Sequence, residues 1–294
     1  MPSKKGMLVC VTFTFCCSTY FLYAYMTRDM LTNCIARGGH SGSYGYVPRG
    51  HPDSKDLNIR RAKALFFERI SEEEKDKFRD LMKIFSEKVS KNVTYFMYAG
   101  ALLGSYSHHG LIPWDDDMDI IVSNNDRPAL LKSLQSLPPE YEHYTGWNTT
   151  WKFYHKNSPK AAKKPWNWPF VDIFFYVEYP TYIQDAREAK KKFNKSVVFP
   201  LTTRPFMGMM LPAPRKTRDF LKTTYDIDMC VSNSYDHRME TDVPSYCRAR
   251  VPCYLLQDRF PFVVRKNSEN KSLETLEDRY HNIYNKDVYA QESA

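Results

Sequence analysis

The sequence has no Cys-x-x-Cys pair, no long basic arm and no internal repeat. The lack of a Cys-x-x-Cys pair argues against a cysteine-based zinc site, and the lack of an internal repeat argues against a repeat architecture. The 42 Lys and Arg residues against 34 Asp and Glu residues leave a net charge of +8, but these positive charges are not gathered into a long basic arm. Without a basic arm or a recognised motif, this charge does not predict nucleic acid as a partner.

Residues 7–26 carry no charge. A run of this length is about what a helix needs to cross a membrane. Lys4 and Lys5 precede this run, and positive charge favours the cytosolic side. We therefore expect residues 1–6 to be a cytosolic tail, residues 7–26 a signal anchor, and the rest of the chain to be lumenal or extracellular. A cleaved signal peptide is the alternative.

Residues 27–60 are rich in Gly, Ser, His and Pro and have few apolar residues, so they are expected to form a flexible stem. The remainder can bury a large core, because 43% of all side chains are apolar and 15% are aromatic. We therefore expect residues 61–294 to form the folded domain.

Cysteines and sequons fit an oxidising compartment. Four cysteines lie beyond the apolar run, at Cys34, Cys230, Cys247 and Cys253, and three of them are close enough to staple a loop, although the pairing is open. Four asparagines stand in acceptor sequons for glycosylation, at Asn92, Asn148, Asn194 and Asn270.

Hydrophobic periodicity and turn residues predict an α+β domain. Ser71 and Glu74 form a capping box before apolar residues at helical spacing. Helices are expected at about 71–91, 101–108, 126–137, 184–195, 214–225 and 273–283, and strands at about 93–99, 117–122, 141–147, 150–155, 169–178 and 197–211.

Four aspartates gather within WDDDMDI. Because side chains on a strand alternate between faces, Asp117 and Asp119 point the same way, and Asp115 and Asp116 precede them in a turn. Anions this close repel one another unless a cation is present, and oxygen ligands suit Mg²⁺ or Mn²⁺. An acidic turn that faces water is the alternative.

Two further residues add to this pattern. Asp172 is a lone carboxylate in the apolar run VDIFFYV, where burial is costly unless it binds a metal or pairs with an arginine. Gly100 ends a predicted strand and opens a short helix, whose N-terminus can receive a phosphate. A metal-dependent site for an activated phosphate is therefore expected.

The residues GALLGSYSHHGLIPWDDDMDI, from Gly100 to Ile120, closely resemble the signature of the LicD family, which includes bacterial phosphocholine transferases and animal fukutin-type proteins. The resemblance continues through VDIFF and FPLTTRPFMGMMLPAPRKTRDFLKTTYD. It implies a nucleotidyltransferase fold of the polymerase-beta type, a mixed sheet flanked by helices. It also implies a single-pass type II protein of the Golgi or endoplasmic reticulum membrane, with residues 61–294 as a lumenal catalytic domain.

The resemblance also implies roles for particular residues. The metal-binding aspartates of the family fall on Asp117 and Asp119, and its third carboxylate falls on Asp172. Its phosphate-side turn falls on Gly100, Leu103, Gly104 and Ser105, and its histidine falls on His108. Ser107 stands where many members carry an arginine, and the candidate substitutes are Arg204, Arg215 and Lys216.

The implied reaction is transfer of a phospho-alditol or phosphocholine group from a CDP-linked donor to a glycan hydroxyl, with Mg²⁺ or Mn²⁺. Asp172 would complete the metal site or accept the hydroxyl proton. Trp166 and Trp168 would stack on a base or sugar, or pack in the core. A glycosyltransferase with an Asp-x-Asp pair and an inactive family member that binds a glycan or a protein partner are the alternative functions.

Overall fold

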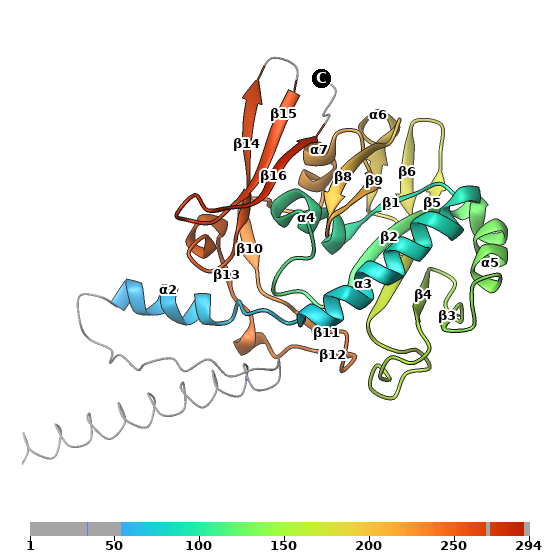
Figure 1. The fold of residues 1–294 in the computed structure, drawn as a ribbon, viewed down its shortest axis with the longest axis horizontal. Helices are drawn as coiled ribbons and strands as arrows, with labels where there is room; N and C mark the ends of the chain where they lie inside the picture. Colours follow the sequence, from blue (N-terminus) through green and yellow to red (C-terminus); the bar gives the residue numbers. More distant parts are fainter. Residues whose placement is uncertain (1–33, 35–53, 269–270, 291–294) are drawn as a thin grey trace, which may run out of the picture.

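The computed structural model describes residue 34, residues 54–268 and residues 271–290 (Figure 1). Its helices are α2 (Ser54–Ala64), α3 (Glu72–Ile84), α4 (Ala99–His108), α5 (Arg127–Gln135), α6 (Lys195–Val198) and α7 (Thr217–Lys222). Short π or 3-10 segments are η1 (Phe85–Val89), η2 (Ser90–Asn92), η3 (Asn124–Asp126), η4 (Ser245–Cys247) and η5 (Cys253–Leu256).

The central sheet is formed by β1 (Tyr95–Met97), β2 (Met118–Ser123), β5 (Phe170–Glu178), β4 (Thr150–His155) and β3 (Tyr141–Tyr144), in that order. Strands β6 (Tyr182–Asp185) and β7 (Lys192–Asn194) extend it from the end of β5. Only the β2–β5 pair is parallel among these described pairs. The sheet is therefore mixed, as predicted, and the fold is α+β.

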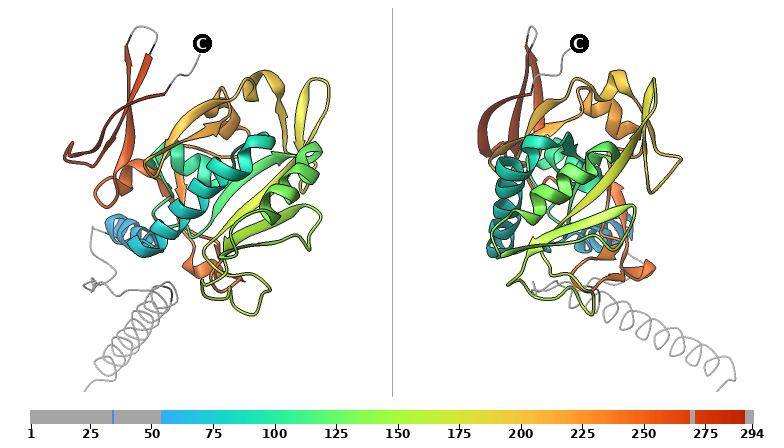
Figure 2. Two further views of the ribbon diagram at one scale, coloured as in Figure 1. Left: turned by 45° about the vertical axis from the view of Figure 1, so that its right-hand side comes forward. Right: turned by 90° about the vertical axis from the view of Figure 1, so that its right-hand side faces the viewer.

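Smaller sheets surround this one. They are the hairpin β8 (Thr202–Phe206) and β9 (Met209–Ala213), the pairs β10 (Met229–Val231) with β13 (Arg250–Pro252) and β11 (Tyr235–Asp236) with β12 (Thr241–Asp242), and a sheet of β14 (Phe262–Ser268), β15 (Lys271–Glu277) and β16 (Ile283–Ala290). Figure 2 shows the β14–β16 sheet standing beside α4, away from the central sheet.

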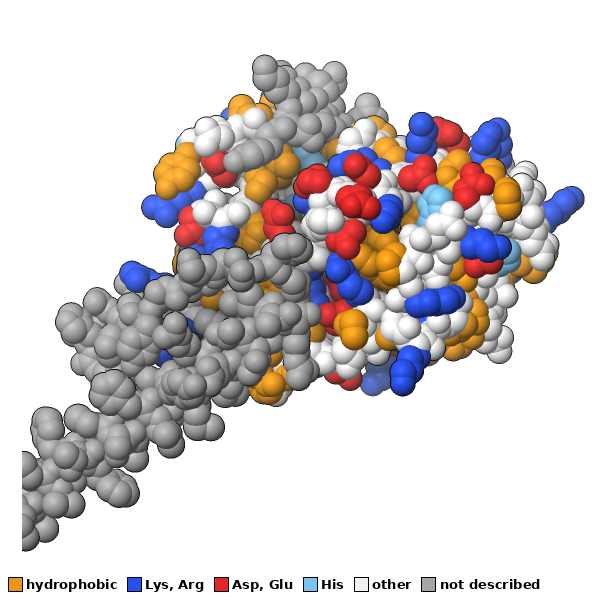
Figure 3. All heavy atoms as spheres, turned by 60° about the horizontal axis from the view of Figure 1, so that its bottom comes forward, with side chains coloured by type: hydrophobic (Ala, Val, Ile, Leu, Met, Phe, Trp, Pro, Cys, Tyr) orange, Lys and Arg blue, Asp and Glu red, His pale blue; other side chains and the backbone are white. Residues whose placement is uncertain are grey.

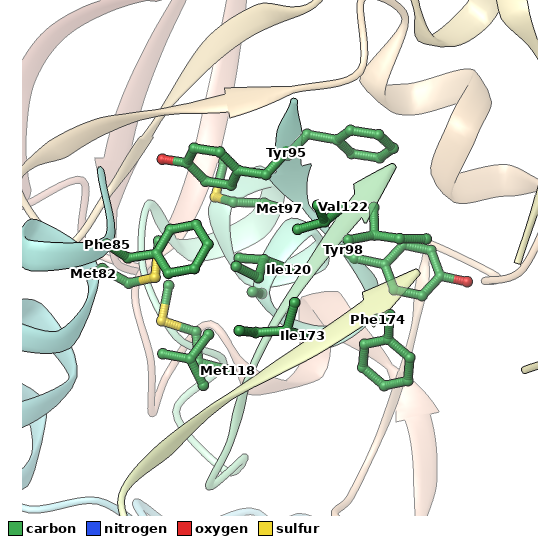
Figure 4. Packing of buried hydrophobic residues seen from close by; sticks show 14 of the residues in the cluster. Met82, Phe85, Tyr95, Met97, Tyr98, Met118, Ile120, Val122, Ile173 and Phe174 are labelled. Atoms are coloured by element: carbon green, nitrogen blue, oxygen red, sulfur yellow. The ribbon is translucent and has the colours of Figure 1, made fainter. Parts of the chain in front are cut away.

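Helix α3 crosses one face of the central sheet (Figures 1 and 2). The capping box is confirmed, because Ser71 accepts from the Glu74 N–H and Glu74 accepts from the Ser71 N–H. Met82 of α3 and Phe85 of η1 pack in one cluster with Met118 and Ile120 of β2 (Figure 4). Since these β2 residues point into the core, Asp119, which lies between them, is on the opposite face.

Helix α4 follows β1 and packs on β2 and α7. Gly104 is required for its packing, because a Cβ there would lie 2.3 Å from the Gly110 carbonyl oxygen. The helix ends at His109, whose φ of 51° is left-handed. The turn after α4 thus approaches the helix backbone closely and leads back to the acidic segment.

The predicted helix at 184–195 is wrong. This segment contributes β6 and β7, which pair antiparallel with Ile183 opposite Phe193. Both side chains are buried. Sheet extension from β5 overrides the helical propensity of the charged residues between them.

The predicted terminal helix at 273–283 is also wrong. Leu273 and Leu276 lie on β15, where Leu276 is opposite Val263 of β14. The side chains of Tyr280 and Ile283 are 72% and 52% exposed, so the apolar spacing that suggested a helix does not form a buried stripe.

Two other segments differ in part from expectation. The predicted strand at 197–211 begins with the short helix α6 and continues as the β8–β9 hairpin, which turns at Met207 and Gly208. The predicted helix at 214–225 is confirmed over the shorter range of α7.

The predicted membrane anchor at 7–26 lies outside the described residues. Within the part of the chain that is described, no helix combines the length and apolar character needed to span a bilayer. Helix α2 begins at Ser54, inside the range expected for the stem, and Cys34 is buried and joined to Cys247.

The second disulfide joins Cys230 to Cys253 and closes the stapled loop expected from the cysteine spacing. On the face drawn in Figure 3, the described Lys and Arg side chains are interspersed with Asp and Glu. The net charge of +8 is therefore not gathered into one basic patch on that part of the surface.

Candidate active site

Three buried carboxylates meet where β2 and β5 run parallel. Asp119 is directly opposite Asp172 in the register of the two strands, and Asp117 is two residues before Asp119 on the same face. One oxygen from each of the three lies within 4.8 Å of the others. The structure therefore brings together the three residues that the sequence suggested as metal ligands.

Gly100 joins α4 to this cluster. Its backbone N–H donates a hydrogen bond to Asp119 Oδ2 over 3.1 Å. A Cβ at Gly100 would lie 2.8 Å from Asp115 Oδ2 and 3.5 Å from Asp119 Oδ2, so only glycine allows both carboxylates this close. The first turn of α4 thus faces the acidic side chains.

The cluster is electrostatically strained without a cation. Burial, together with the charges of Asp117 and Asp172, raises the pKa of Asp119 well above its usual range. Burial also raises the pKa of Asp117, with Asp172 adding to the effect and His237 opposing it. A divalent cation would relieve this repulsion, and the oxygen donors suit Mg²⁺ or Mn²⁺.

Lys152 is a site residue that the sequence analysis missed. It lies on β4 opposite Asp172, and its Nζ is 2.7 Å from Asp172 Oδ1. Asp172 is therefore ion-paired, as one alternative foresaw, but with a lysine rather than an arginine. The β3–β4 strand pair was predicted, yet nothing in the sequence indicates which strand lies beside β5.

His237 was also missed. Its Nδ1 lies 2.9 Å from Asp116 Oδ1 and its Nε2 lies 3.1 Å from Asp117 Oδ2. Burial alone would lower the pKa of His237, but the charges of Asp117 and Asp116 outweigh it and raise the pKa to about 10. His237 therefore carries positive charge beside the cluster.

Asp116 is not one of the three carboxylates of the cluster, and it anchors the segment that bears His237. It accepts from the His237 backbone N–H at 3.1 Å and from Asn233 Nδ2 at 3.0 Å, and Arg69 Nη2 lies 3.8 Å from it. Asp116 is thus a structural carboxylate, and it couples the acidic turn to the disulfide-closed region.

A cavity of about 410 Å³ opens at the acidic cluster. One part of its wall comes from α4 and the acidic turn, and another part comes from the segment between Tyr225 and His237. The predicted residues among those that line it are Gly100, Leu103, His108, Asp117 and Asp119. The Cys230–Cys253 disulfide also lines the cavity.

Gly104 and Ser105 support this wall from behind. Gly104 has no side chain, which leaves room for the backbone at Gly110. Ser105 is fully buried, and its hydroxyl donates a hydrogen bond to the Pro205 carbonyl at 2.8 Å. Neither is among the described residues that line the cavity.

His108 has a defined tautomer. Its Nδ1 lies 2.8 Å from the Pro261 carbonyl oxygen, which can only accept, so Nδ1 is the protonated nitrogen. Burial lowers the pKa of His108 to about 4. His108 is therefore a neutral side chain at the cavity wall.

Trp166 and Trp168 are packing residues. They are 1% and 2% exposed, and their Nε1 atoms donate to Glu240 and to the Asp116 carbonyl, respectively. Neither lines the cavity in the described part of the chain, so stacking on a ligand there is not supported.

Ser107, which stands where many members of the family carry an arginine, lines the cavity. Of Arg204, Arg215 and Lys216, none is among the described residues that line it. Arg204 is instead 1% exposed and bound to Glu274 at 2.7 Å. These residues do not replace the missing arginine in the cavity wall.

Comparison with known proteins identifies the domain that carries this site. Residues 92–216 match the LicD/FKTN/FKRP nucleotidyltransferase domain. This range includes α4, the three carboxylates of the cluster and Lys152. The chain therefore contains a LicD-family domain over these residues.

Two curated relatives are uncharacterised proteins. One, from Rickettsia prowazekii, is 37% identical over 75 residues, which cover 25% of this chain and 27% of that protein. The other, from Rickettsia typhi, is 42% identical over 59 residues, which cover 20% of this chain and 19% of that protein. The shared part is thus about a quarter or less of each relative.

Proposed function

We propose that this protein transfers a phospho-alditol or phosphocholine-type group from a CDP-linked donor to a hydroxyl of a glycan on a glycoprotein or glycolipid. The observation that carries this proposal is the register of β2 and β5, which places Asp172 beside Asp119 at the start of α4. An Asp-x-Asp glycosyltransferase site would give neither Asp172 nor Gly100 a role.

The donor set fits a divalent cation. Asp117, Asp119 and Asp172 are buried oxygen donors within 4.8 Å of one another. They would hold Mg²⁺ or Mn²⁺, which supplies positive charge for a pyrophosphate whose CMP portion departs. Lys152 and His237 neutralise only part of the negative charge of the aspartates that they contact.

The residues of this chain would bind and orient the donor. Gly100 keeps Asp119 in place through its N–H, and the N-terminus of α4 presents its positive end to phosphate. Leu103 and His108 form the wall beside the acidic cluster, and Gly104 and Ser105 fix α4 against the chain behind it. Such positioning is the main protein contribution to phosphoryl transfer.

The transfer breaks the bond between phosphorus and the CMP oxygen and forms a bond from phosphorus to the acceptor oxygen, whose proton is released to water while CMP departs. Asp172 is better suited to bind the cation than to accept this proton. Lys152 already binds Asp172 Oδ1, and Asp172 is not among the described residues that line the cavity.

The proposed location is the lumen of the Golgi or endoplasmic reticulum, with residues 7–26 as a type II membrane anchor. Two disulfides and three exposed sequon asparagines, Asn92, Asn148 and Asn194, support it. The anchor itself rests on the sequence alone.

A donor screen tests the reaction. The purified full chain, with Mn²⁺ and a membrane glycoprotein fraction as acceptor, is incubated with CDP-ribitol, CDP-glycerol, CDP-choline or a set of nucleotide sugars. We expect CMP release from at least one of the three CDP-linked donors. Asp119→Asn should reduce it by ~10²-fold or more, because it removes a charge that binds the cation.

Asp219→Asn is the matched control, since Asp219 is an exposed aspartate on α7. It should release CMP at the wild-type rate. Nucleotide release from sugar donors alone would instead indicate a glycosyltransferase. Absence of turnover with every donor, together with equal and negligible Mn²⁺ binding by wild type and Asp119→Asn, would indicate a binding protein.

A further inference from the structure

Lys152 is a buried lysine inside the acidic site. Its side chain is 4% exposed, and that of Asp172 is 9% exposed. A buried ammonium is costly unless it is paired and well surrounded. The direct register of β4 against β5 supplies the partner, because it places Lys152 opposite Asp172.

Aromatic rings hold the ammonium in place. Lys152 Nζ lies 3.5 Å from the centroid of the Phe170 ring and 4.9 Å from that of Trp166, with Trp147 at 5.9 Å. Phe170 is two residues before Asp172 on β5 and therefore shares its face. Cation–π attraction and the ion pair together restrict the lysine to one position.

A carboxylate has two oxygens, and Lys152 occupies one of them. The ion pair uses Asp172 Oδ1 at 2.7 Å, which leaves Oδ2 outside this contact. A second divalent cation bridging Asp172 would have to compete with an ammonium that is already in contact. A second cation bound to Asp172 would lie close to the Lys152 ammonium, and charge repulsion between the two would be strong in a buried site.

We propose that Lys152 is a permanent cation of the site that takes the place of a second divalent ion, so that the three-carboxylate cluster takes one divalent ion rather than two. Lys152 is thus a positioning residue: it orients Asp172 and limits the positive charge that the cluster can accept. The inference rests on the proposed function, because it assumes that the cluster binds Mg²⁺ or Mn²⁺.

Mn²⁺ titration of the full chain tests this inference directly, by calorimetry or by electron paramagnetic resonance of free Mn²⁺. Subtracting the binding of Asp119→Asn removes ions held elsewhere on the surface. Wild type is expected to bind one Mn²⁺ at the cluster. Lys152→Met keeps an unbranched apolar stem but removes the charge, and should bind Mn²⁺ at least ~10-fold more tightly or take up a second ion.

Two variants serve as controls. Lys152→Arg keeps the positive charge and should bind one Mn²⁺ with wild-type affinity. Lys156→Met removes an exposed lysine just beyond β4, whose Nζ is 3.5 Å from Glu142, and should change nothing. An increase in Mn²⁺ affinity on Lys152→Met would distinguish the two explanations, because simple loss of structure would weaken Mn²⁺ binding.

The inference is overturned if wild type takes two Mn²⁺ at the cluster, a result that does not depend on whether Lys152→Met folds. It is also overturned if folded Lys152→Met binds one ion with unchanged or weaker affinity. In either case the proposed metal-dependent function stands. If wild type and Asp119→Asn both fail to bind Mn²⁺, the metal site of the proposed function falls, and this inference falls with it.

Discussion

At the scale of single residues, Gly100 controls how closely the acidic side chains approach the backbone of α4. Its missing side chain leaves room for Asp115 and lets its N–H reach Asp119. The same close approach puts the positive end of the helix beside the carboxylates, where it stabilises negative charge. A small steric change here should therefore act on the site more than on the fold.

Gly100→Ala tests this directly. Its Cβ would lie 2.8 Å from Asp115 Oδ2, so the carboxylates must shift. We expect Mn²⁺ affinity and CMP release to fall by ~10-fold or more, because small displacements of site groups have large effects. The free energy of unfolding, measured with urea, should change by less than ~1 kcal/mol.

Gly208→Ala is the contrasting variant. Gly208 has a φ of 82° and open space around its Cβ position, and it lies in the β8–β9 turn. Alanine should cost about 1 kcal/mol of stability in this backbone conformation but leave Mn²⁺ binding unchanged. If both glycine variants lose only stability, Gly100 does not shape the metal site.

At the scale of elements, a buried ionic network joins the β14–β16 sheet to α4. Glu274 of β15 binds Arg204 of β8 at 2.7 Å, Arg265 of β14 at 2.9 Å and His109, which follows α4, at 3.0 Å. The guanidinium carbon of Arg265 lies 3.5 Å from the centroid of the Tyr106 ring on α4. This network holds the C-terminal end of the helix whose N-terminal end contributes to the candidate active site.

Glu274→Gln is expected to destabilise the protein by about 3 kcal/mol, because it leaves buried cations without their carboxylate. Urea denaturation measures this loss. Glu142→Gln is the control: Glu142 pairs with Lys156 at 3.5 Å on the surface, and its loss should cost less than ~0.5 kcal/mol. Equal losses in both variants would show that the Glu274 network contributes no more than a surface pair.

The same carboxylate predicts a pH dependence. Burial alone would raise the pKa of Glu274, but His109, Arg204 and Arg265 outweigh it and lower the pKa to about 2 from 4.5. Glu274 therefore stabilises the fold fully above about pH 4.5, and this contribution declines as the pH falls toward 2. Between these values, wild type should lose more stability than Glu274→Gln.

At the scale of the whole molecule, the disulfides connect parts of the chain that lie far apart in sequence. Cys34 and Cys247 are separated by 213 residues, and Cys230–Cys253 closes a loop that forms part of the cavity wall. This wall lies beyond the family match at 92–216. The part of the cavity wall between residues 225 and 253 therefore comes from the C-terminal region, outside the matched domain.

Lumenal placement predicts glycosylation of the full chain in animal cells. Asn92, Asn148 and Asn194 are exposed, so each can be reached by the transferring enzyme. Endoglycosidase treatment should increase the electrophoretic mobility, and each of Asn92→Gln, Asn148→Gln and Asn194→Gln should remove one step of the shift. Asn125→Gln alters an exposed asparagine outside any sequon and should have no effect. A chain without any glycan would contradict the lumenal placement.

Local patterns were sufficient for several elements of the site. The capping box predicted the start of α3, and the alternation rule placed Asp117 and Asp119 on one face. The apolar run predicted β5 and singled out Asp172 as anomalous. These features follow from periodicity and capping, which depend on residues a few positions apart.

Pairing between distant segments was decided only by the tertiary structure. Sequence could not show that Lys152 would face Asp172, that His237 would bind an aspartate 121 residues earlier, or that the segment at 273–283 would join a sheet rather than form a helix. Such contacts depend on which strands become neighbours, and packing over the whole molecule settles that choice. The sequence by itself thus determined the carboxylates of the candidate site, whereas the tertiary structure decided which cationic side chains and which cavity wall surround them.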